Sequence, residues 1–241
     1  MKIAVVIPAR YQSSRLPGKP LVDLCGKTMI QRVVERCSQA ELAKEVIVLT
    51  DSHEILEEVH KWNGNAVMTP SSCLTGTDRC AAFALNSDYD YFVNVQGDEP
   101  LLDPEDLNEI IRHARNHPNL VINGYAPIAS DEEYRSRHTP KVVLAPSGRL
   151  LYMSRSPIPG NKADTFQGSH RQICIYGFPK QSLVEFAAHP GKTPLEDIED
   201  IEILRFLEMG HEVGMVKLSG NSVAVDRMED VERVRKLLNE Q

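Results

Sequence analysis

The sequence predicts an α/β protein whose sheet is mostly parallel and carries an inserted layer of β-hairpin. Short, continuously apolar segments alternate with helical periodicities through the N-terminal half, and such segments are typical of strands covered on both faces. A β-α-β-α order predicts parallel strands joined by right-handed crossovers. In the middle third, two β-rich runs flank a turn, which indicates a hairpin. With 241 residues, the chain is expected to form a single domain over residues 1–241.

The first half contains three predicted strands, each followed by a predicted helix. The strands are KIAVVIPA (2–9), EVIVLTD (45–51) and YDYFVNVQGDEP (89–100), the last ending in a turn at Gly97. The first helix covers residues 28–40, and the second carries Ile55, Leu56 and Val59. The third begins at Asp103, which caps it, with Pro104 in the first position. These assignments place three loops at the carboxyl ends of three strands.

The second half is predicted to be mixed. KVVLAPSGRLLYMSRSPIP (141–159) indicates a hairpin and RQICIYGFP (171–179) another strand, so residues of about 135–175 form the hairpin layer. Helices are expected over 180–188 and 194–209, the second closed by Gly210. After the strand EVGMVKLS (212–219), the segment VAVD (223–226) is expected to end a strand. The C-terminal helix that follows is expected to turn inward its apolar side chains Met228, Val231, Val234 and Leu238.

Composition excludes several classes of function. The formal net charge of −7 argues against a nucleic-acid partner, because phosphate backbones are bound by basic surfaces. The five cysteines are odd in number and scattered, which suits a cytoplasmic protein and makes a disulfide framework or a structural zinc site unexpected. No apolar stretch is long enough to span a membrane. A local group of cations in this acidic chain therefore points to one small anion.

Such a group follows the first strand, in the segment PARYQSSRLPGKPL (8–21). It carries Arg10, Arg15 and Lys19 between prolines and a glycine that interrupt helix and strand. Two guanidiniums, an ammonium and freed backbone N–H groups suit a polyphosphate. The segment is neither a Walker A loop nor the dinucleotide fingerprint. An ordinary solvated basic turn is the alternative interpretation.

Two aspartates support the phosphate interpretation. Asp98 follows Gly97 at the end of the third predicted strand, and Asp226 ends the segment VAVD. Ligands of open α/β sheets bind beyond the carboxyl ends of the strands. There the two carboxylates can hold Mg²⁺ against phosphate oxygens, since magnesium takes one or two carboxylates and leaves its other positions to phosphates and water. The alternative is a cap or turn role, and for Asp226 the sequence VDRMED resembles a capped helix start.

The motifs also resemble a known family. In chain order they are IPARYQSSRLPGKPL, TGTDR, VNVQGDEP, KVVL, LYMSRSPIP, IYGF, LEDIEDIEILRFLEMG and VDRMEDVERV. They are similar to those of the 3-deoxy-manno-octulosonate (Kdo) cytidylyltransferases, or CMP-Kdo synthetases, over nearly the whole chain. The basic-loop motif is shared with other sugar nucleotidyltransferases, whereas NVQGDEP with YxSRxxIP is more specific. The resemblance implies a Rossmann-like sheet of the nucleotide-diphospho-sugar transferase type.

The resemblance also implies an activity, namely transfer of CMP from CTP to the anomeric hydroxyl of Kdo with release of pyrophosphate. Arg10, Arg15 and Lys19 would hold the triphosphate, and together with Asp98 they would be the catalytic residues. Asp98 and Asp226 would hold Mg²⁺. The rest of the CTP site would be Pro8, Ala9, Leu74, Thr75, Gly76 and Thr77. Arg155 would meet the carboxylate of the sugar, and Gln96, Tyr176 and Glu202 would contact its hydroxyls. A homodimer formed through the hairpin layer is likewise implied.

Two departures from the family pattern fall in the pocket for the acceptor sugar. RQICIYGFP carries Gln172 where the family has a histidine, and IEILR carries Ile203 where the family has a glutamine. Losing a polar contact to a hydroxyl changes substrate selection strongly. An amino-substituted octulosonate (8-amino-Kdo), another ulosonic acid or a phosphonate therefore remain alternative acceptors, and neutral drift with compensating water remains possible.

Two further alternatives concern the nucleotide part of the implied reaction. A regulatory module could bind CTP without turnover, although the presence of Asp98 and Asp226 argues against it. A nucleotidyltransferase for another nucleotide is the second alternative. Finally, Glu196, Glu199 and Glu202 recur every three residues, so they are expected along one strip of a helix, the first two facing solvent or a second subunit.

Overall fold

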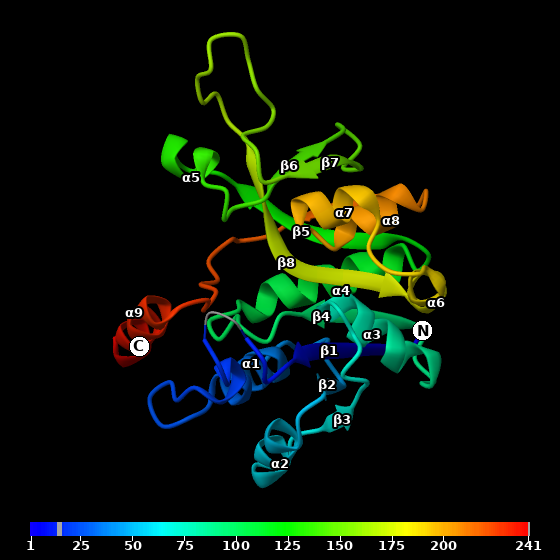
Figure 1. Cartoon of the computed structure of the whole chain (residues 1–241), viewed down its shortest axis with the longest axis vertical. Coiled ribbons are helices and arrows are strands. Elements are labelled where there is room, and N and C mark those ends of the chain that lie inside the picture. The colour runs from blue at the N-terminus through cyan, green and yellow to red at the C-terminus, as the bar shows by residue number, and fades with distance from the viewer. Residues whose placement is uncertain (14–15, 241) are drawn as a thin grey trace.

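A computed structural model describes residues 1–13 and 16–240 of the chain. Within them, the main sheet runs in the order β3-β2-β1-β4-β8-β5-β9 (Figure 1). The strands in that order are Ala66–Met68, Val46–Thr50, Ile3–Ala9, Tyr91–Val95, His170–Pro179, Val121–Pro127 and Val213–Lys217. Strands β3, β2, β1 and β4 run parallel to one another. Strand β8 is antiparallel to β4 and β5, and β9 is parallel to β5. The predicted mostly parallel α/β sheet is confirmed.

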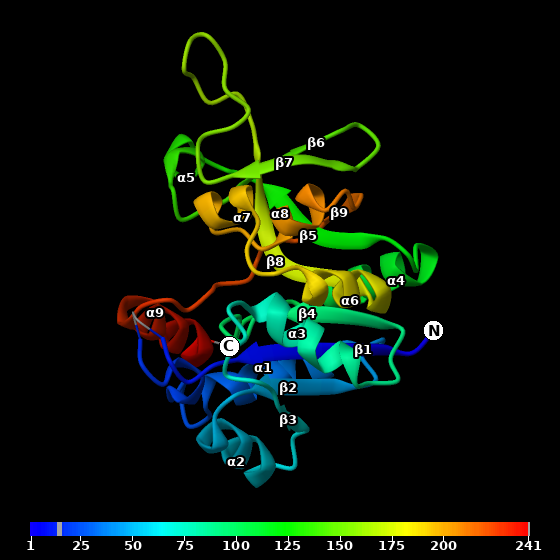
Figure 2. The ribbon, with the colours of Figure 1, turned by 45° about the vertical axis from the view of Figure 1, so that its right-hand side comes forward.

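Helices cover both faces of the sheet because side chains alternate along each strand. Val5, Ile7 and Val93 point to one face, where they pack with α1 (Met29–Ser38), α2 (His53–Lys61) and α4 (Pro104–Asn116). On the opposite face, Ala4 and Phe92 pack with α3 (Gly76–Leu85), α6 (Lys180–Ala188) and α8 (Ile203–Glu208). Figure 2 shows α3 and α6 together on one side of β4. The double covering explains why the strands read as continuous apolar runs.

The predicted helix starts and the hairpin are present. The carboxylate of Asp103 accepts a hydrogen bond from the N–H of Glu105 at 3.0 Å and caps α4, as predicted. Strands β6 (Lys141–Leu144) and β7 (Leu150–Ser154) form the hairpin, and β6 also pairs with β8. The connection from β7 to β8 extends away from the sheet at the top of Figure 1. The hairpin layer therefore lies at one end of the molecule.

The helix predicted over 194–209 is instead two helices, α7 (Pro194–Glu199) and α8. They separate at Asp200, whose φ of 50° lies in the left-handed region, which Asp tolerates better than most residues. Arg155 stabilises the break, because its guanidinium donates to the carbonyl oxygens of Glu199 at 2.6 Å and Asp200 at 2.9 Å. Side-chain periodicity alone does not reveal such a break.

The prediction that three glutamates lie along one strip of a helix was also wrong. Glu196 is buried against Arg205, and Glu199 accepts hydrogen bonds from the hydroxyl of Ser154 at 2.6 Å and the N–H of Arg155 at 2.9 Å. The break at Asp200 rotates the two helices relative to each other, so the three glutamates no longer share a face. The first two therefore serve contacts inside this chain.

The C-terminal prediction was partly wrong. Residues 223–226 form a loop, not a strand, because the backbone there pairs with no strand and instead donates from Val225 to the carbonyl of Asp98 at 2.9 Å. In α9 (Met228–Asn239), Val231 and Val234 are buried as expected, but Met228 is exposed. Met228 is the first residue of the helix, where it lies beyond the core that the later turns cover.

Four further α-helices and β-strands had no sequence-based prediction. They are β3, α3, β5 and the short helix α5 (Asp131–Arg135). Helix α3 begins at a capping box, in which Thr75 and Asp78 exchange hydrogen bonds between side chain and backbone at 2.9 and 3.1 Å. The same residues lie in the TGTDR motif, so the box was a readable helix signal.

A buried ion network joins α8 to α7 and α3. The guanidinium of Arg205 donates to both carboxylate oxygens of Glu196, at 2.5 and 2.7 Å, and to Asp78 at 2.9 Å. It also lies 3.8 Å from the ring centroid of Phe186. Because Asp78 caps α3 at Thr75, the network connects two helices of the second half to the start of α3.

Replacing Arg205 by Met should strongly destabilise the fold. The substitution leaves the buried carboxylate of Glu196 without its partner, which costs about 3–5 kcal/mol in comparable cases. Urea denaturation followed by circular dichroism measures the free energy of unfolding. As a control, Arg112→Met removes an exposed pair with Glu105 and Glu109 and should change the free energy of unfolding far less. Equal effects of the two substitutions would contradict the assigned importance of the buried network.

Candidate active site

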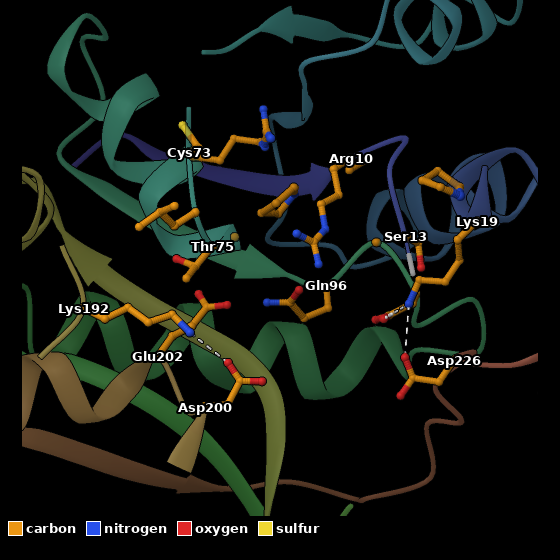
Figure 3. Close-up of a pocket in the computed structure, with 18 residues that line it drawn as sticks. Arg10, Ser13, Lys19, Cys73, Thr75, Gln96, Lys192, Asp200, Glu202 and Asp226 are labelled. Carbon is orange, nitrogen blue, oxygen red and sulfur yellow. Dashed lines mark hydrogen bonds and ion pairs between the residues drawn. The ribbon is translucent and has the colours of Figure 1, made fainter. Parts of the chain in front are cut away.

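A cavity of about 290 Å³ lies where β1 and β4 end. It opens at the edge of the sheet at which parallel α/β folds bind their ligands. Eleven of the predicted site residues line it, namely Pro8, Ala9, Arg10, Lys19, Leu74, Thr75, Gly76, Gln96, Asp98, Glu202 and Asp226 (Figure 3). Arg15 lies outside the described residues. The structure thus brings together segments from the N-terminus, the middle and the C-terminal part of the chain.

The basic loop is shaped as its prolines and glycine predict. Gly18 has a φ of 67°, a conformation that favours glycine, and a short 3-10 helix over Lys19–Leu21 follows it. The turn directs the Lys19 side chain back toward the sheet. Its Nζ donates to Asp98 Oδ2 at 2.5 Å and to Asp226 Oδ1 at 3.3 Å (Figure 3). The ammonium therefore lies between the two carboxylates that were predicted to hold a metal ion.

Backbone contacts fix the two aspartates. Gly97 lies so close to β1 that a Cβ there would stand 2.9 Å from the carbonyl oxygen of Pro8, so only glycine fits this approach. Val225 donates to the carbonyl of Asp98 at 2.9 Å, and the N–H of Asp226 donates to Asp230 at 2.9 Å. Asp226 is thus held by a loop at the start of α9 rather than by the predicted strand end.

Asp98 and Asp226 suit a divalent cation. Both carboxylates already converge on one cationic group, the ammonium of Lys19. Among the residues the structure describes, no group of three or more His, Cys, Asp and Glu forms a complete metal cage. Magnesium needs no such cage, because one or two carboxylates and substrate phosphates are its usual ligands. The donor set therefore fits a metal that arrives with a phosphorylated substrate.

Glu202 lines the cavity, and the buried Glu99 is the chain neighbour of the lining residue Asp98. Burial and the neighbouring Asp98 carboxylate raise the pKa of Glu99 to about 7, although a hydrogen bond from the hydroxyl of Ser222 opposes the shift. Burial also raises the pKa of Glu202, whose carboxylate accepts a hydrogen bond from the backbone N–H of Thr77 at 2.7 Å. Glu202 therefore both lines the cavity and holds the first turn of α3 in place.

Five of the predicted residues do not line the cavity. Thr77 is buried at the start of α3, and Ile203 is buried in the core beneath the sheet. Gln172 donates from Nε2 to Asn123 Oδ1 at 3.0 Å and to the Tyr176 hydroxyl at 3.3 Å, so its amide is already bonded inside the protein. The fifth, Arg155, is bonded to backbone carbonyls. The structure thus shows no contact of Ile203 with the cavity that would let it select an acceptor.

Seven lining residues were not among the predicted site residues, namely Ser13, Pro20, Cys73, Arg79, Gly97, Lys192 and Asp200. Arg79 donates to Asp51 at 2.8 Å and to the Thr69 hydroxyl at 2.5 Å, and it ends the quoted TGTDR motif. Lys192 Nζ lies 3.0 Å from Asp200 Oδ1, and this hydrogen bond lowers the pKa of Asp200. Asp200 lies within the quoted motif LEDIEDIEILRFLEMG and Lys192 lies before it, but the motif does not indicate the pair, because the position of Asp200 depends on the break between α7 and α8.

A cationic loop that faces paired carboxylates at the carboxyl edge of an α/β sheet defines a nucleotidyltransferase, a class whose chemistry requires phosphate binding and charge neutralisation. Comparison with known proteins gives the particular family. The sequence profile of the cytidylyltransferases matches residues 4–216, and the chain belongs to this family.

Its relatives agree along the full length. The chain is 40% identical to the 3-deoxy-manno-octulosonate cytidylyltransferase of Syntrophotalea carbinolica, with 97% of both chains covered. It is 41% identical to the enzyme of the same name from Myxococcus xanthus, covering 98% of this chain and 96% of that one. A solved CMP:2-keto-3-deoxy-manno-octonic acid synthetase complexed with CTP superposes with a TM-score of 0.93 at 35% identity, over 100% of this chain and 99% of the other. The resemblance in the motifs is therefore confirmed.

Lys19→Met should raise the affinity of the protein for a divalent cation when no nucleotide is present. The ammonium of Lys19 competes with a metal ion for Asp98 and Asp226, so its removal leaves two carboxylates that attract a cation more strongly. We expect about a tenfold lower dissociation constant for Mn²⁺, which corresponds to about 1.4 kcal/mol. Titration followed by electron paramagnetic resonance measures it.

The matched control for this experiment is Lys19→Arg, which keeps a positive charge in the loop and should bind Mn²⁺ no more tightly than the unchanged protein. If Lys19→Met also binds Mn²⁺ no more tightly, the ammonium does not compete with the metal. If Lys19 served the phosphates alone, Lys19→Met would weaken CTP binding without strengthening metal binding.

Proposed function

We propose that this chain transfers CMP from CTP to the anomeric hydroxyl of 3-deoxy-manno-octulosonate in a magnesium-dependent reaction that releases pyrophosphate. The observation that carries the proposal is the cavity in which Lys19, Asp98 and Asp226 meet beside the loop of residues 74–76. The relatives with this name, and the CTP complex of a similar structure, support the same reaction.

The nucleotide would bind between the end of β1 and the start of α3. Pro8, Ala9, Leu74, Thr75 and Gly76 line this part of the cavity and would surround cytosine. Gly76 approaches the site closely, since a Cβ there would lie 3.5 Å from both Pro8 and Gln96. N–H groups at the start of a helix suit an anion or a carbonyl oxygen. Thr77 would act from the buried side, by fixing Glu202 against this turn.

The triphosphate would lie over the basic loop. Arg10 and Lys19 line the cavity there, and Arg15 belongs to the same motif. Asp98 and Asp226 would hold Mg²⁺, which supplies charge neutralisation at the phosphates and favours ionisation of the sugar hydroxyl. Lys19 would then leave the two carboxylates and neutralise the departing pyrophosphate. In this arrangement the protein contributes orientation and charge rather than covalent chemistry.

The acceptor would bind on the other side of Gln96. Gln96 and Glu202 line the cavity and can contact hydroxyl groups. Tyr176 and Gln172 lie behind them and hydrogen-bond to each other, so we assign them to the support of this wall. Arg155 does not line the cavity, and its guanidinium donates to the carbonyl oxygens of Glu199 and Asp200, so we assign it to the support of this turn rather than to the carboxylate of the sugar.

Assembly and location belong to the same proposal. We propose that the chain acts as a single cytidylyltransferase domain and forms a homodimer through the hairpin layer, where the side chain of Leu151 is exposed on β7. The described cysteines are all free, which suits the cytoplasm, where CTP is available. No helix in the described part of the chain combines the length and apolarity needed to cross a membrane.

The direct test of the activity is pyrophosphate release. The protein with Mg²⁺, CTP and 3-deoxy-manno-octulosonate should release pyrophosphate, and UTP should compete poorly with CTP. Asp98→Asn should lower the rate by about 10²–10³-fold, because a group that neutralises developing charge is lost. Asp88→Asn changes an exposed aspartate away from the cavity and should leave the rate unchanged.

A panel of acceptors completes this test. The same assay with 8-amino-Kdo, other ulosonic acids and a phosphonate identifies the preferred acceptor. No release with any ulosonic acid would overturn the sugar assignment. Uptake of Mg–CTP without release with any acceptor would instead identify a binding module.

The dimer has its own test. Analytical ultracentrifugation of the unchanged protein should show a dimer, and Leu151→Glu should shift it to the monomer because the charge would be buried between hairpin layers. Leu85→Glu places the same charge on another exposed leucine, on α3, and should leave the dimer intact. A monomeric unchanged protein, or equal effects of the two substitutions, would refute this interface.

A further inference from the structure

The cavity contains a second pair of opposite charges that the mechanism above does not use. Lys192 Nζ and Asp200 Oδ1 lie 3.0 Å apart, and both residues line the cavity. Figure 3 shows them with Glu202 on one side of the cavity, whereas Lys19 and Asp226 lie on the other side. Gln96 stands between the two groups in this view. The cavity therefore offers charged groups at both ends.

The backbone holds both residues of this pair in place. Lys192 is followed by Thr193, whose N–H donates to the buried carboxylate of Glu196 at 3.1 Å. Asp200 occupies the left-handed turn between α7 and α8, and Arg155 donates to its carbonyl oxygen at 2.9 Å. These contacts use backbone atoms, and the guanidinium of Arg155 also lies 3.9 Å from Asp200 Oδ2, so the carboxylate faces both Lys192 and Arg155 at the edge of the cavity.

Stability does not account for the pair. The side chain of Lys192 is 25% exposed and that of Asp200 is 75% exposed, and ion pairs this accessible contribute little to folding. The ammonium has three donors, of which Asp200 uses one, and the carboxylate keeps most of its acceptor positions. A donor beside an acceptor at this spacing suits neighbouring hydroxyl groups of a polyol.

The orientation of the acceptor rests on the proposed function. The reacting hydroxyl must lie close to the phosphate that Asp98 and Asp226 serve. In an octulosonate this hydroxyl belongs to the second of eight carbons, beside the carboxylate. The opposite end of the molecule, with its terminal hydroxyls, must then point away from Asp98 and Asp226, toward Lys192 and Asp200.

We propose that Lys192 and Asp200 form a specificity site that binds the terminal hydroxyls of the acceptor. The ammonium donates to one hydroxyl oxygen, and the carboxylate accepts from the neighbouring hydroxyl. Binding leaves the ion pair intact, since each group has hydrogen-bonding capacity beyond the contact at 3.0 Å. The pair selects for acceptor length and for polar groups at the end away from the reaction.

The test combines two enzyme variants with two acceptors. The variants are Lys192→Met and Asp200→Asn, and the acceptors are 3-deoxy-manno-octulosonate and an analogue that lacks the terminal two carbons. With the full-length acceptor, each variant should raise the acceptor KM about tenfold, the loss expected for one hydrogen bond to a charged group. With the short acceptor, variants and unchanged enzyme should agree within about twofold. The KM for CTP should not change.

The control is Lys162→Met, which removes an exposed lysine in the connection from β7 to β8, outside the cavity. It should leave every constant unchanged. An equal rise in the acceptor KM with both acceptors, or a parallel rise in the KM for CTP, would show a structural effect and overturn the specificity site. Absence of turnover by the unchanged enzyme with any octulosonate would instead remove the proposed function, and this inference with it.

Discussion

The active site depends on the charge of Lys19. Its ammonium joins three parts of the chain, since Asp98 follows β4 and Asp226 precedes α9. Two carboxylates that converge on one point repel each other strongly in a partly buried site unless a cation lies between them. The lysine supplies that cation before a metal arrives. On the proposed function, the cationic loop would belong to the metal site as well as to the phosphate site, because its prolines and glycine direct the Lys19 side chain to the two carboxylates.

A second network links the two substrate sides of the cavity. Arg205 connects α8 to Asp78, and Asp78 caps the helix whose first residues line the nucleotide side. Glu202, directly before α8, accepts a hydrogen bond from the backbone N–H of Thr77. The helices that carry acceptor groups are thus bonded directly to the nucleotide loop. These buried charged contacts fix the position of the acceptor side relative to the nucleotide side.

Much of this arrangement could be predicted from local sequence. Apolar runs identified β1, β2, β4 and β8, and the residues after β1 and β4 supplied the nucleotide half of the site. The break between α7 and α8 could not be predicted, because it depends on Arg155. This residue follows the distant strand β7 and donates to the carbonyl oxygens of Glu199 and Asp200. That break places Asp200, so the pair with Lys192 was equally invisible. Asp226 was found for an incorrect reason, since a loop and not a strand holds it.

The difference between local sequence signals and distant contacts also applies to the residues proposed to bind the acceptor. Gln172 and Ile203 differ from the family pattern, yet neither lines the cavity, because one amide is bonded to Asn123 and the other side chain is buried in the core. Their effect on selection must therefore act through the wall that they support. The groups that do face the cavity at this end, Lys192 and Asp200, belong to turns whose conformation depends on distant contacts. On the proposed specificity site, acceptor choice would be set by the turns around α7, and CTP recognition by the ends of the strands.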